Sequence, residues 1–462
     1  MNPASPEAWA GVTPTVSPAT PPRSNPIAAR LRAYGSSPRI VGVDIARGLA
    51  VLGMFGAHIG VSDPFSLGQP ATWLDLVNGR SSILFAVLAG LSIAIISGRT
   101  TVVTGTDLLQ ARIRIVVRAV LIFAIGGLLQ TLGTPIAVIL PVYALLFVVS
   151  LPFLRWRPRH LFILAGVLAV VMPVLRLLIT PLLETVLTYN GAFPELLVWG
   201  SYPAMIWITF VLVGLGIGRL DLGALRVQVW ILLAGIVLAT VGYGAGAVAS
   251  AVVTGNDSLD TALVSASTDI GSDGEYVEPE VVPGSDVDVS GLECVEYSAG
   301  VLTRAAPGFF DPTADEELSD DTDAAPGFTY TVDFSSLWTL EAHSGSPFEV
   351  IGSTGFALGV LALSLLAARR LRWLLFPVSA VGAMALTAYT AHVIVLAAIG
   401  DVAFAQPDNG LYSWFVLGTL VLCTAWVVLL GRGPLERLLT WASRSAATIT
   451  DRSTTAPFTG EQ

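Results

Sequence analysis

Ten continuously apolar stretches limit what this chain of 462 residues can fold into more than any other feature of its sequence. They begin near Ile40, Ser81, Ile113, Pro135, His160, Tyr202, Val227, Phe348, Leu374 and Leu411. A helix needs about 20 apolar residues to cross a bilayer core of about 30 Å. Strands of a membrane barrel would alternate apolar and polar residues, which these stretches do not. The sequence therefore predicts an all-α polytopic membrane bundle of about ten transmembrane helices, with the lipid bilayer as its partner.

The distribution of arginine, the only basic residue apart from histidine, indicates the orientation. Cytoplasmic loops of membrane proteins collect positive side chains near the helix ends. If the N-terminus is cytoplasmic, 20 of the 24 arginines fall in cytoplasmic segments, with Arg80 and Arg304 outside and Arg47 and Arg176 within spans. We therefore expect a multi-pass protein of a bacterial-type plasma membrane with both termini cytoplasmic. The first span should direct insertion, because the N-terminal residues lack the pattern of a cleavable signal peptide.

One acidic segment interrupts the apolar stretches. Between Thr254 and Ser346, about 20 acidic residues accompany a single arginine, which is typical of a solvated and partly disordered loop. Within it, Gly291–Phe310 and Phe328–Leu340 have enough apolar residues for short strands or a small cap. The predicted organisation is a cytoplasmic tail (1–38), seven spans (39–253), an acidic extracytoplasmic loop (254–346), three spans (347–432) and a cytoplasmic tail (433–462). No metal site is expected, because the acids lack the ligand spacing of a calcium loop and the two cysteines lie far apart.

The first span carries three ionisable residues, Asp44, Arg47 and His58. Such residues are costly in lipid and are functional candidates by default. At about 100° per residue they fall within an arc of about 60° on one helix face. Asp44 and Arg47 have the spacing of an i,i+3 ion pair at the cytoplasmic end, whereas His58 lies near the outer end. A structural ion pair with a separate histidine explains the same pattern.

Further polar residues come close to His58 in the predicted topology. Asp75 and Arg80 precede the second span, and His343 and Glu349 flank the start of the eighth. His392 lies in the ninth span. A neutral histidine is the usual proton acceptor for an attacking hydroxyl or amine, so these residues are candidates for an outward-facing pocket.

Four short motifs, in this order, resemble those of heparan-alpha-glucosaminide N-acetyltransferase-like proteins and their bacterial YeiB-type relatives. They are Val43–Met54 (VDIARGLAVLGM), Asn78–Phe85 (NGRSSILF), Gly382–Tyr389 (GAMALTAY) and Gly433–Arg437 (GPLER). The resemblance extends from about residue 38 to 445 and excludes the acidic segment. It implies a transmembrane acyltransferase that moves an acetyl or similar group from cytosolic acyl-coenzyme A to an envelope saccharide or glycolipid on the far side.

The resemblance also suggests roles for individual residues. In the eukaryotic enzymes an active-site asparagine stands fourteen residues after the aspartate of the first motif, where this chain has His58. Their catalytic histidine follows in the next outer loop, where an ungapped reading gives Gln69, so His58 is the candidate general base. Asp44 and Arg47 would shape the inner half of the pocket, and Tyr389 joins the pocket candidates. Arg112, Arg114 and Arg118 would hold the phosphates of coenzyme A, although attachment to anionic lipid explains these arginines equally well.

The same residues are also compatible with a transport function. In a transporter or flippase of envelope precursors, Asp44, Arg47 and His58 would line a path, and inverted repeats or broken helices would favour that reading. A purely structural membrane scaffold is a third alternative. No nucleic-acid partner is expected, and the sequence leaves homo-oligomerisation open.

Overall fold

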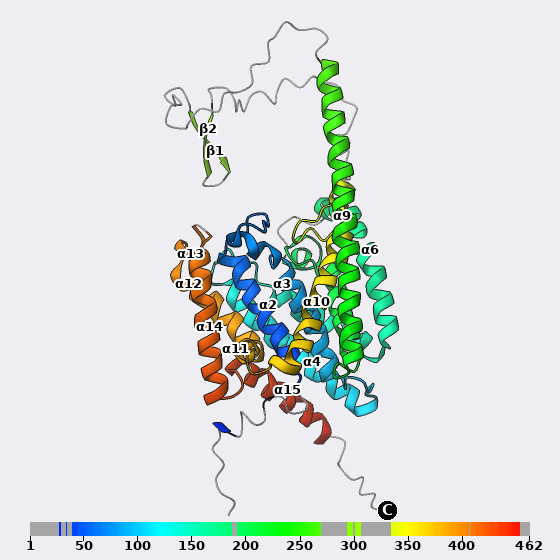
Figure 1. The fold of residues 1–462 in the computed structure, drawn as a ribbon, viewed down its shortest axis with the longest axis vertical. Coiled ribbons are helices and arrows are strands. Elements are labelled where there is room, and N and C mark those ends of the chain that lie inside the picture. The colour runs from blue at the N-terminus through cyan, green and yellow to red at the C-terminus, as the bar shows by residue number, and fades with distance from the viewer. Residues whose placement is uncertain are drawn as a thin grey trace, which may run out of the picture. The chain divides into compact units, whose positions relative to one another are not determined.

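The computed structural model of the protein describes residues 27–28, 34, 39–186, 192–268, 293–298, 301–305, 334–405 and 407–452. It contains two compact units, one of residues 1–252 and 334–462 and one of residues 253–333. We call the first the membrane unit, because it carries the apolar helices (Figure 1). Much of the acidic segment, and most of the predicted N-terminal tail, lie outside the described residues.

The helices of the membrane unit follow the apolar stretches of the sequence. In chain order they are α2 (Val41–Ile59), η1 (Pro70–Leu76), α3 (Arg80–Ile96), α4 (Gly105–Gln130), α5 (Leu140–Val149), η2 (Leu151–Arg155), α6 (Pro158–Val186), α7 (Ala192–Pro194), the π-helical η3 (Glu195–Trp199), α8 (Ala204–Gly218), α9 (Leu225–Thr268, which continues into the second unit), η5 (Phe334–Leu337), α10 (Pro347–Leu371), α11 (Phe376–Ala383), α12 (Ala385–Ile399), α13 (Val402–Ala405), α14 (Asn409–Leu429) and α15 (Pro434–Arg452).

Length and composition allow seven of the described helices to cross a membrane. The pair α11 and α12, bent by 82° at a short break, would be an eighth span, and α5 and α8 are shorter apolar helices. Each of the ten apolar stretches is thus a helix or, for the ninth, this broken pair. The predicted helical membrane bundle is confirmed, while the count of ten spans stays a prediction.

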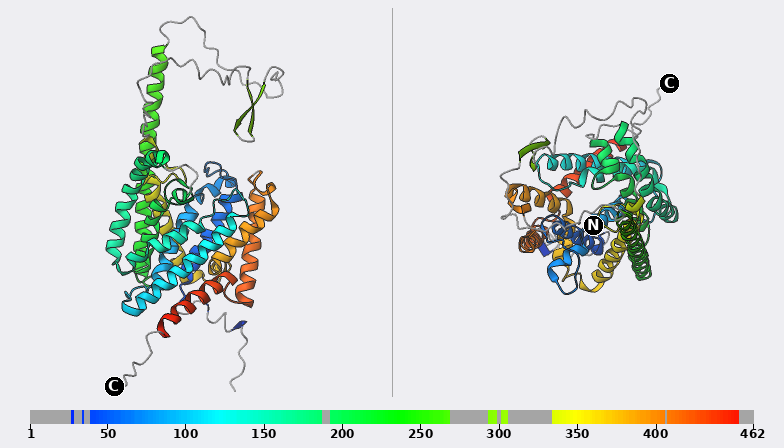
Figure 2. Two further views of the ribbon diagram at one scale, coloured as in Figure 1. Left: turned by 180° about the vertical axis from the view of Figure 1, so that it is seen from behind. Right: turned by 90° about the horizontal axis from the view of Figure 1, so that it is seen from above.

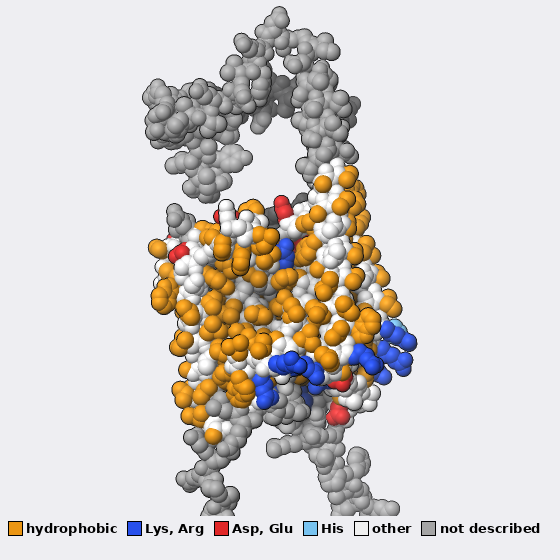
Figure 3. Space-filling model, in the orientation of Figure 1, with side chains coloured by type: hydrophobic (Ala, Val, Ile, Leu, Met, Phe, Trp, Pro, Cys, Tyr) orange, Lys and Arg blue, Asp and Glu red, His pale blue; other side chains and the backbone are white. Residues whose placement is uncertain are grey.

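The spans differ in how deeply they are buried. Most residues of α2 and α3 are buried, whereas α4, α6, α9 and α14 bury only a minority of their residues. Figure 2 shows α14 on one side of the membrane unit and α6 and α9 on the other. A broad belt of apolar side chains covers the face seen in Figure 3, with arginines gathered at one end. This is the surface expected of helices that face lipid.

Close packing of α3 against α8 forms much of the core. A Cβ atom added to Gly90 would collide with the carbonyl oxygen of Val211, and one added to Gly214 would collide with that of Val87. The two backbones can approach this closely because both positions are glycine, as at many helix contacts in membranes.

Two elements lie at the arginine-rich end. The short helix α11 packs against the inner half of α2, and α15 runs obliquely across this end beside α4 and α12 (Figures 1 and 2). α15 has apolar residues on one face and polar residues on the other, a pattern typical of helices at a membrane surface.

The second unit contains an antiparallel hairpin of β1 (Glu293–Ser298) and β2 (Val301–Ala305). Glu293 pairs with Ala305 and Ser298 with Val301, and the register is irregular between Glu296 and Ser298. The hairpin lies within one of the two segments for which the sequence suggested strands. The other, Phe328–Leu340, is outside the described residues up to position 333 and then forms η5.

Candidate active site

Asp44 and Arg47 form the predicted ion pair near the inner end of α2. The carboxylate of Asp44, only 7% exposed, accepts from Arg47 Nη1 at 3.3 Å and from Arg39 Nε at 2.7 Å. Arg47 Nη2 also donates to Ser92 Oγ on α3 at 2.6 Å. These are the ion pairs among the described residues. Arg39 was not among the sequence candidates, and its presence means that loss of Arg47 would still leave Asp44 one cationic partner.

At the other end of α2, His58 is paired with His392 of α12. The Nδ1 atom of His58 lies 2.9 Å from Nε2 of His392, and the two rings are stacked with planes 7° apart. His58 is half-buried, whereas His392 is only 3% exposed and packs against the ring of Phe55. The structure therefore brings together two histidines that are 334 positions apart in the sequence.

The hydrogen bonds assign the protons of this pair. His392 Nδ1 lies 2.6 Å from the carbonyl oxygen of Tyr389, which can only accept, so this nitrogen carries a proton. In a neutral imidazole the other nitrogen, Nε2, is then an acceptor, and His58 Nδ1 must donate to it. Within the part of the chain that the structure describes, the Nε2 atom of His58 is left with a free lone pair, which is the form that a general base requires.

His343 lies near this pair but comes from the segment before α10. Its backbone has a positive φ of 66°, and its ring is packed against Tyr202 and Trp207. Burial lowers the pKa of His343, and burial raises the pKa of Tyr202 to about 12, so both side chains are neutral near pH 7. A charge on His343 would act on His58. A third histidine thus lies within electrostatic range of the pair.

Glu349 holds the loop that carries His343. Its carboxylate accepts from the backbone N–H groups of His343 at 2.9 Å and Gly345 at 2.6 Å, and from the hydroxyl of Ser344 at 3.2 Å. Ser346 caps α10 by accepting from the backbone N–H of Glu349, with Pro347 as the first helical residue. Glu349 is 4% exposed, and these contacts fix the loop that carries His343.

Arg80 and Asp75 are also occupied by local contacts. Arg80 Nε donates to the hydroxyl of Tyr243 at 2.8 Å, and Nη1 donates to backbone carbonyls of η1. The Tyr243 hydroxyl lies 2.8 Å from Ser353 Oγ, which links α3, α9 and α10. Asp75 accepts from the backbone N–H of Phe65 at 3.3 Å. Tyr243 and Ser353 could not be predicted, because nothing in their own segments distinguishes them from residues at ordinary helix contacts.

The three arginines predicted for coenzyme A differ in their surroundings. Arg112 lies on the exposed side of α4, whereas Arg114 and Arg118 are half-buried one turn apart. Four further cations act electrostatically on Arg118, and no carboxylate is among them; they are Arg47, Arg114, Arg432 and Arg444. The Nε atom of Arg114 is buried without a hydrogen-bond partner among the described residues. Arg432 and Arg444 were missed because they lie more than 300 positions away along the chain.

The four sequence motifs meet around α2. Gly382 of the third motif lies against the backbone carbonyl of Asp44 in the first, where a Cβ atom would collide. Ser81 of the second motif faces Gly53 of the first. In the fourth motif, Glu436 accepts from the backbone N–H of Thr387 at 3.1 Å and from its hydroxyl at 2.6 Å. The motifs therefore form one contact network from the arginine-rich end of α2 to the histidine pair.

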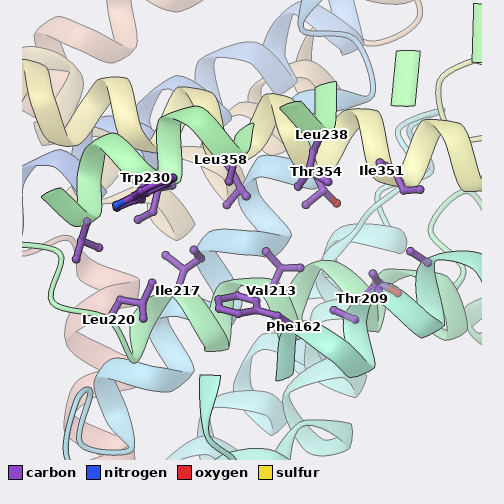
Figure 4. Close-up of a pocket in the computed structure, with 16 residues that line it drawn as sticks. Phe162, Thr209, Val213, Ile217, Leu220, Trp230, Leu238, Ile351, Thr354 and Leu358 are labelled. Atoms are coloured by element: carbon purple, nitrogen blue, oxygen red, sulfur yellow. The ribbon is translucent and has the colours of Figure 1, made fainter. Parts of the chain in front are cut away.

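A separate apolar cavity of about 530 Å³ lies between α6, α8, α9 and α10 (Figure 4). Its walls include Phe162, Val213, Trp230 and Leu358, and none of the candidate residues lines it. Among the described residues no group of three or more His, Cys, Asp or Glu side chains could hold a metal ion.

Comparison with known proteins supports the interpretation of the first two motifs, Val43–Met54 and Asn78–Phe85. The family described as "Heparan-alpha-glucosaminide N-acetyltransferase, catalytic" matches residues 39–244, which include Asp44, Arg47, His58 and Arg118. No curated protein and no solved structure matches the chain. Residues 39–244, a little under half of the chain, are therefore similar to the catalytic region of the heparan-alpha-glucosaminide N-acetyltransferase family.

Proposed function

We propose that the protein transfers an acetyl or similar acyl group from cytosolic acyl-coenzyme A to a saccharide or glycolipid of the cell envelope on the other side of the plasma membrane. The observation that carries this proposal is the free Nε2 of His58, fixed by His392, at the opposite end of α2 from a group of arginines. The similarity of residues 39–244 to a catalytic family of the acetyltransferase type supports the class of reaction.

His58 is the general base of this proposal. Its Nε2 takes the proton from the attacking hydroxyl or amine, which forms a bond to the thioester carbonyl carbon. The carbon–sulfur bond then breaks, and the sulfur of coenzyme A leaves with the proton from His58. His392 takes no proton in this scheme, because it acts as the acceptor that keeps His58 in the required tautomer.

The phosphates of the donor are assigned to the arginines around Arg118. Guanidinium groups suit phosphate because their N–H donors form a planar fork, and Arg114 still has a buried donor to offer. From Asp44 to His58, fourteen residues of α2 rise about 21 Å. The extended arm of coenzyme A has to cover a comparable distance, so phosphates and thioester would lie at opposite ends of the helix. Arg112 is left out of this assignment because it faces away from Arg118.

The orientation of the protein in the membrane follows from assigning the donor phosphates to the arginines around Arg118. If the arginine-rich end holds coenzyme A, this end is cytoplasmic, as the distribution of arginine predicts, and His58 faces the envelope. Asp75, Arg80, His343, Glu349 and Tyr389 then support the acceptor end by fixing the backbone and walls around the two histidines.

One observation favours the alternative of a transporter or flippase. The 82° bend between α11 and α12 resembles the discontinuous helices that form substrate sites in transporters. Under this alternative, coenzyme A has no role and the histidine pair lines a path.

Reconstituted vesicles separate the two functions. Labelled acetyl-coenzyme A is supplied on the side of the arginine-rich end and amino sugars or envelope glycolipids on the other. Labelled acylated acceptor in step with release of coenzyme A supports the transferase. Movement of unmodified precursor without any release of coenzyme A contradicts it and supports the transporter.

A further inference from the structure

We propose that a pocket at the arginine-rich end, separate from the arginines around Arg118, binds a phosphate-bearing anion. The pocket has a volume of about 430 Å³ and is formed by the segment before α2, the turn after α3, the turn before α9 and the end of α10. Four arginines line it, namely Arg39, Arg99, Arg369 and Arg372. The anion is the headgroup of an acidic phospholipid or a soluble phosphate compound.

Arginines outnumber acidic groups at the pocket. Among the described residues Asp221 is the one acidic residue in its lining, and its Oδ1 accepts from the backbone N–H of Gly223 at 3.0 Å within its own turn. Arg39 is paired with Asp44, but Arg99, Arg369 and Arg372 have no ion pair among the described residues. Three guanidinium groups without an ion pair therefore surround a space that contains one carboxylate, and the net positive charge favours an anion.

Arg369 is held in position before any ligand binds. Its Nη1 donates to the carbonyl of Gly223 at 3.2 Å and to Gln228 Oε1 at 3.3 Å. Gln228 is only 3% exposed, and its own Nε2 donates to the carbonyl of Leu222 at 2.7 Å. Because a guanidinium has five N–H donors, Arg369 keeps others for a phosphate oxygen. A buried amide that fixes an arginine at a pocket wall distinguishes this site from a surface cluster of free arginines.

Arg99 reaches the pocket from a backbone conformation that is unfavourable for its residue type. Its φ is 55°, in the left-handed region. The turn is held by Arg219, which is 6% exposed and donates to the backbone carbonyls of Ser97 at 3.0 Å and Arg99 at 2.8 Å. The surrounding structure thus maintains a strained backbone that brings a cation to the pocket, an arrangement often found at binding sites.

Asp44 separates this pocket from the proposed donor site. Its Oδ2 binds Arg39, which lines the pocket, and its Oδ1 binds Arg47, which belongs to the group around Arg118. Arg47, Arg114 and Arg118 do not line the pocket. The proposal therefore stands without the acyltransferase reaction.

Binding is tested on the full-length protein in a neutral detergent by the shift of its thermal unfolding midpoint with probe concentration. One probe is phosphatidylglycerol, compared with phosphatidylcholine; the other is inorganic pyrophosphate. We expect at least one of the anionic probes to bind and the double variant Arg369→Gln/Arg372→Gln to weaken its binding about tenfold or more, since each lost bond to a charged group corresponds to roughly this factor.

Two further variants keep the test independent of folding. Arg99→Asn removes a third cation while retaining a residue that tolerates positive φ, and it should also weaken binding. Arg370→Gln is the matched control, because Arg370 lies on the same helix end but does not line the pocket. It should bind the probe as the wild type does.

The outcome also identifies the source of the phosphate. A response to phosphatidylglycerol alone assigns a lipid headgroup, a response to pyrophosphate alone assigns a soluble compound, and both responses assign the phosphate group itself. The proposal is overturned if neither probe binds, or if the Arg369→Gln/Arg372→Gln and Arg99→Asn proteins bind as tightly as the wild type. Loss of binding in Arg370→Gln to the same degree would also overturn it.

Discussion

A histidine among apolar helices is stabilised by a partner for each ring nitrogen, and the two histidines of the His58–His392 pair differ in that respect. Both nitrogens of His392 lie within hydrogen-bond distance of a partner, the Tyr389 carbonyl and the His58 ring. His58 has one such contact, through Nδ1. The arrangement follows the general pattern of a base that is oriented by a second residue. In this arrangement His58 takes the proton, and His392 positions the ring of His58.

Replacement of His392 tests this separation. His392→Ala leaves His58 Nδ1 without an acceptor, so we expect kcat to fall about 10- to 100-fold with little change in KM, less than the roughly 10²–10⁴-fold that a general base contributes. His392→Gln should recover part of the rate, because its amide can accept from His58 and donate to Tyr389. Wild-type kcat in His392→Ala would show that His58 is not oriented by this bond.

His343 makes the stability of the protein depend on pH. Burial lowers its pKa in the folded protein below the unfolded value of about 6.5. The unfolded chain therefore binds the proton more readily, and the contribution of His343 to stability is present above about pH 6.5 and is lost as the pH falls. His343→Asn removes this group and keeps a residue that accepts the positive φ.

The measurement is the unfolding midpoint in detergent at pH 7.5 and pH 5. His58 and His392 are present in both proteins, so the difference between wild type and His343→Asn reports His343 together with its electrostatic effect on His58. We expect the wild type to lose more stability on acidification than the variant does. Equal losses would mean that His343 is not buried in the way described.

Among the helices, the break between α11 and α12 determines where the histidine pair lies. α11 packs against Asp44 at the inner end of α2, and after the break α12 carries Tyr389 and His392 towards His58. Glu436 of α15 binds both the backbone N–H and the hydroxyl of Thr387, in the first turn of α12. One carboxylate thus connects the helix across the arginine-rich end to the helix that positions the base.

Glu436→Ala should destabilise this connection. It leaves the Thr387 N–H and hydroxyl without their acceptor, at a cost of about 1–3 kcal/mol. We expect Glu436→Ala to have a lower unfolding midpoint and slower acyl transfer than the wild type. Glu436→Gln keeps one acceptor oxygen, so its midpoint and rate should lie between those of Glu436→Ala and the wild type. An unchanged midpoint in Glu436→Ala would show that α12 does not depend on α15.

At the scale of the whole molecule, the sequence predicts the helices better than the contacts between them. Apolar stretches locate the helices because backbone N–H and C=O groups in lipid find hydrogen-bond partners only within the protein. The i,i+3 spacing locates the ion pair of Asp44 and Arg47. The contact between His58 and His392 depends on how the first and ninth stretches pack, which no local pattern encodes. The same holds for Arg39 at Asp44 and for Arg432 near Arg118.

The orientation of the membrane unit is a prediction of this account. With Cys294 and Cys423 replaced, a cysteine at Ser319 should react with a thiol reagent that cannot cross the membrane, and a cysteine at Thr101 should not. Thr101 lies in the turn beside Arg99, at the arginine-rich end. The reverse labelling pattern would place the arginines outside and remove the basis for a cytosolic donor.

The central claim is that His58 is the base of an acyl transfer across the membrane, and the rate of the His58→Ala protein tests it most directly. Release of coenzyme A from acetyl-coenzyme A is measured in reconstituted vesicles that contain amino sugar or glycolipid acceptors, beside a His160→Ala control. His160 is exposed at the start of α6, remote in sequence from all four motifs. We predict a rate about 10²–10⁴-fold lower in His58→Ala, with unchanged affinity for coenzyme A and a wild-type rate in the control. A His58→Ala protein that transfers acyl groups at the wild-type rate would contradict the account.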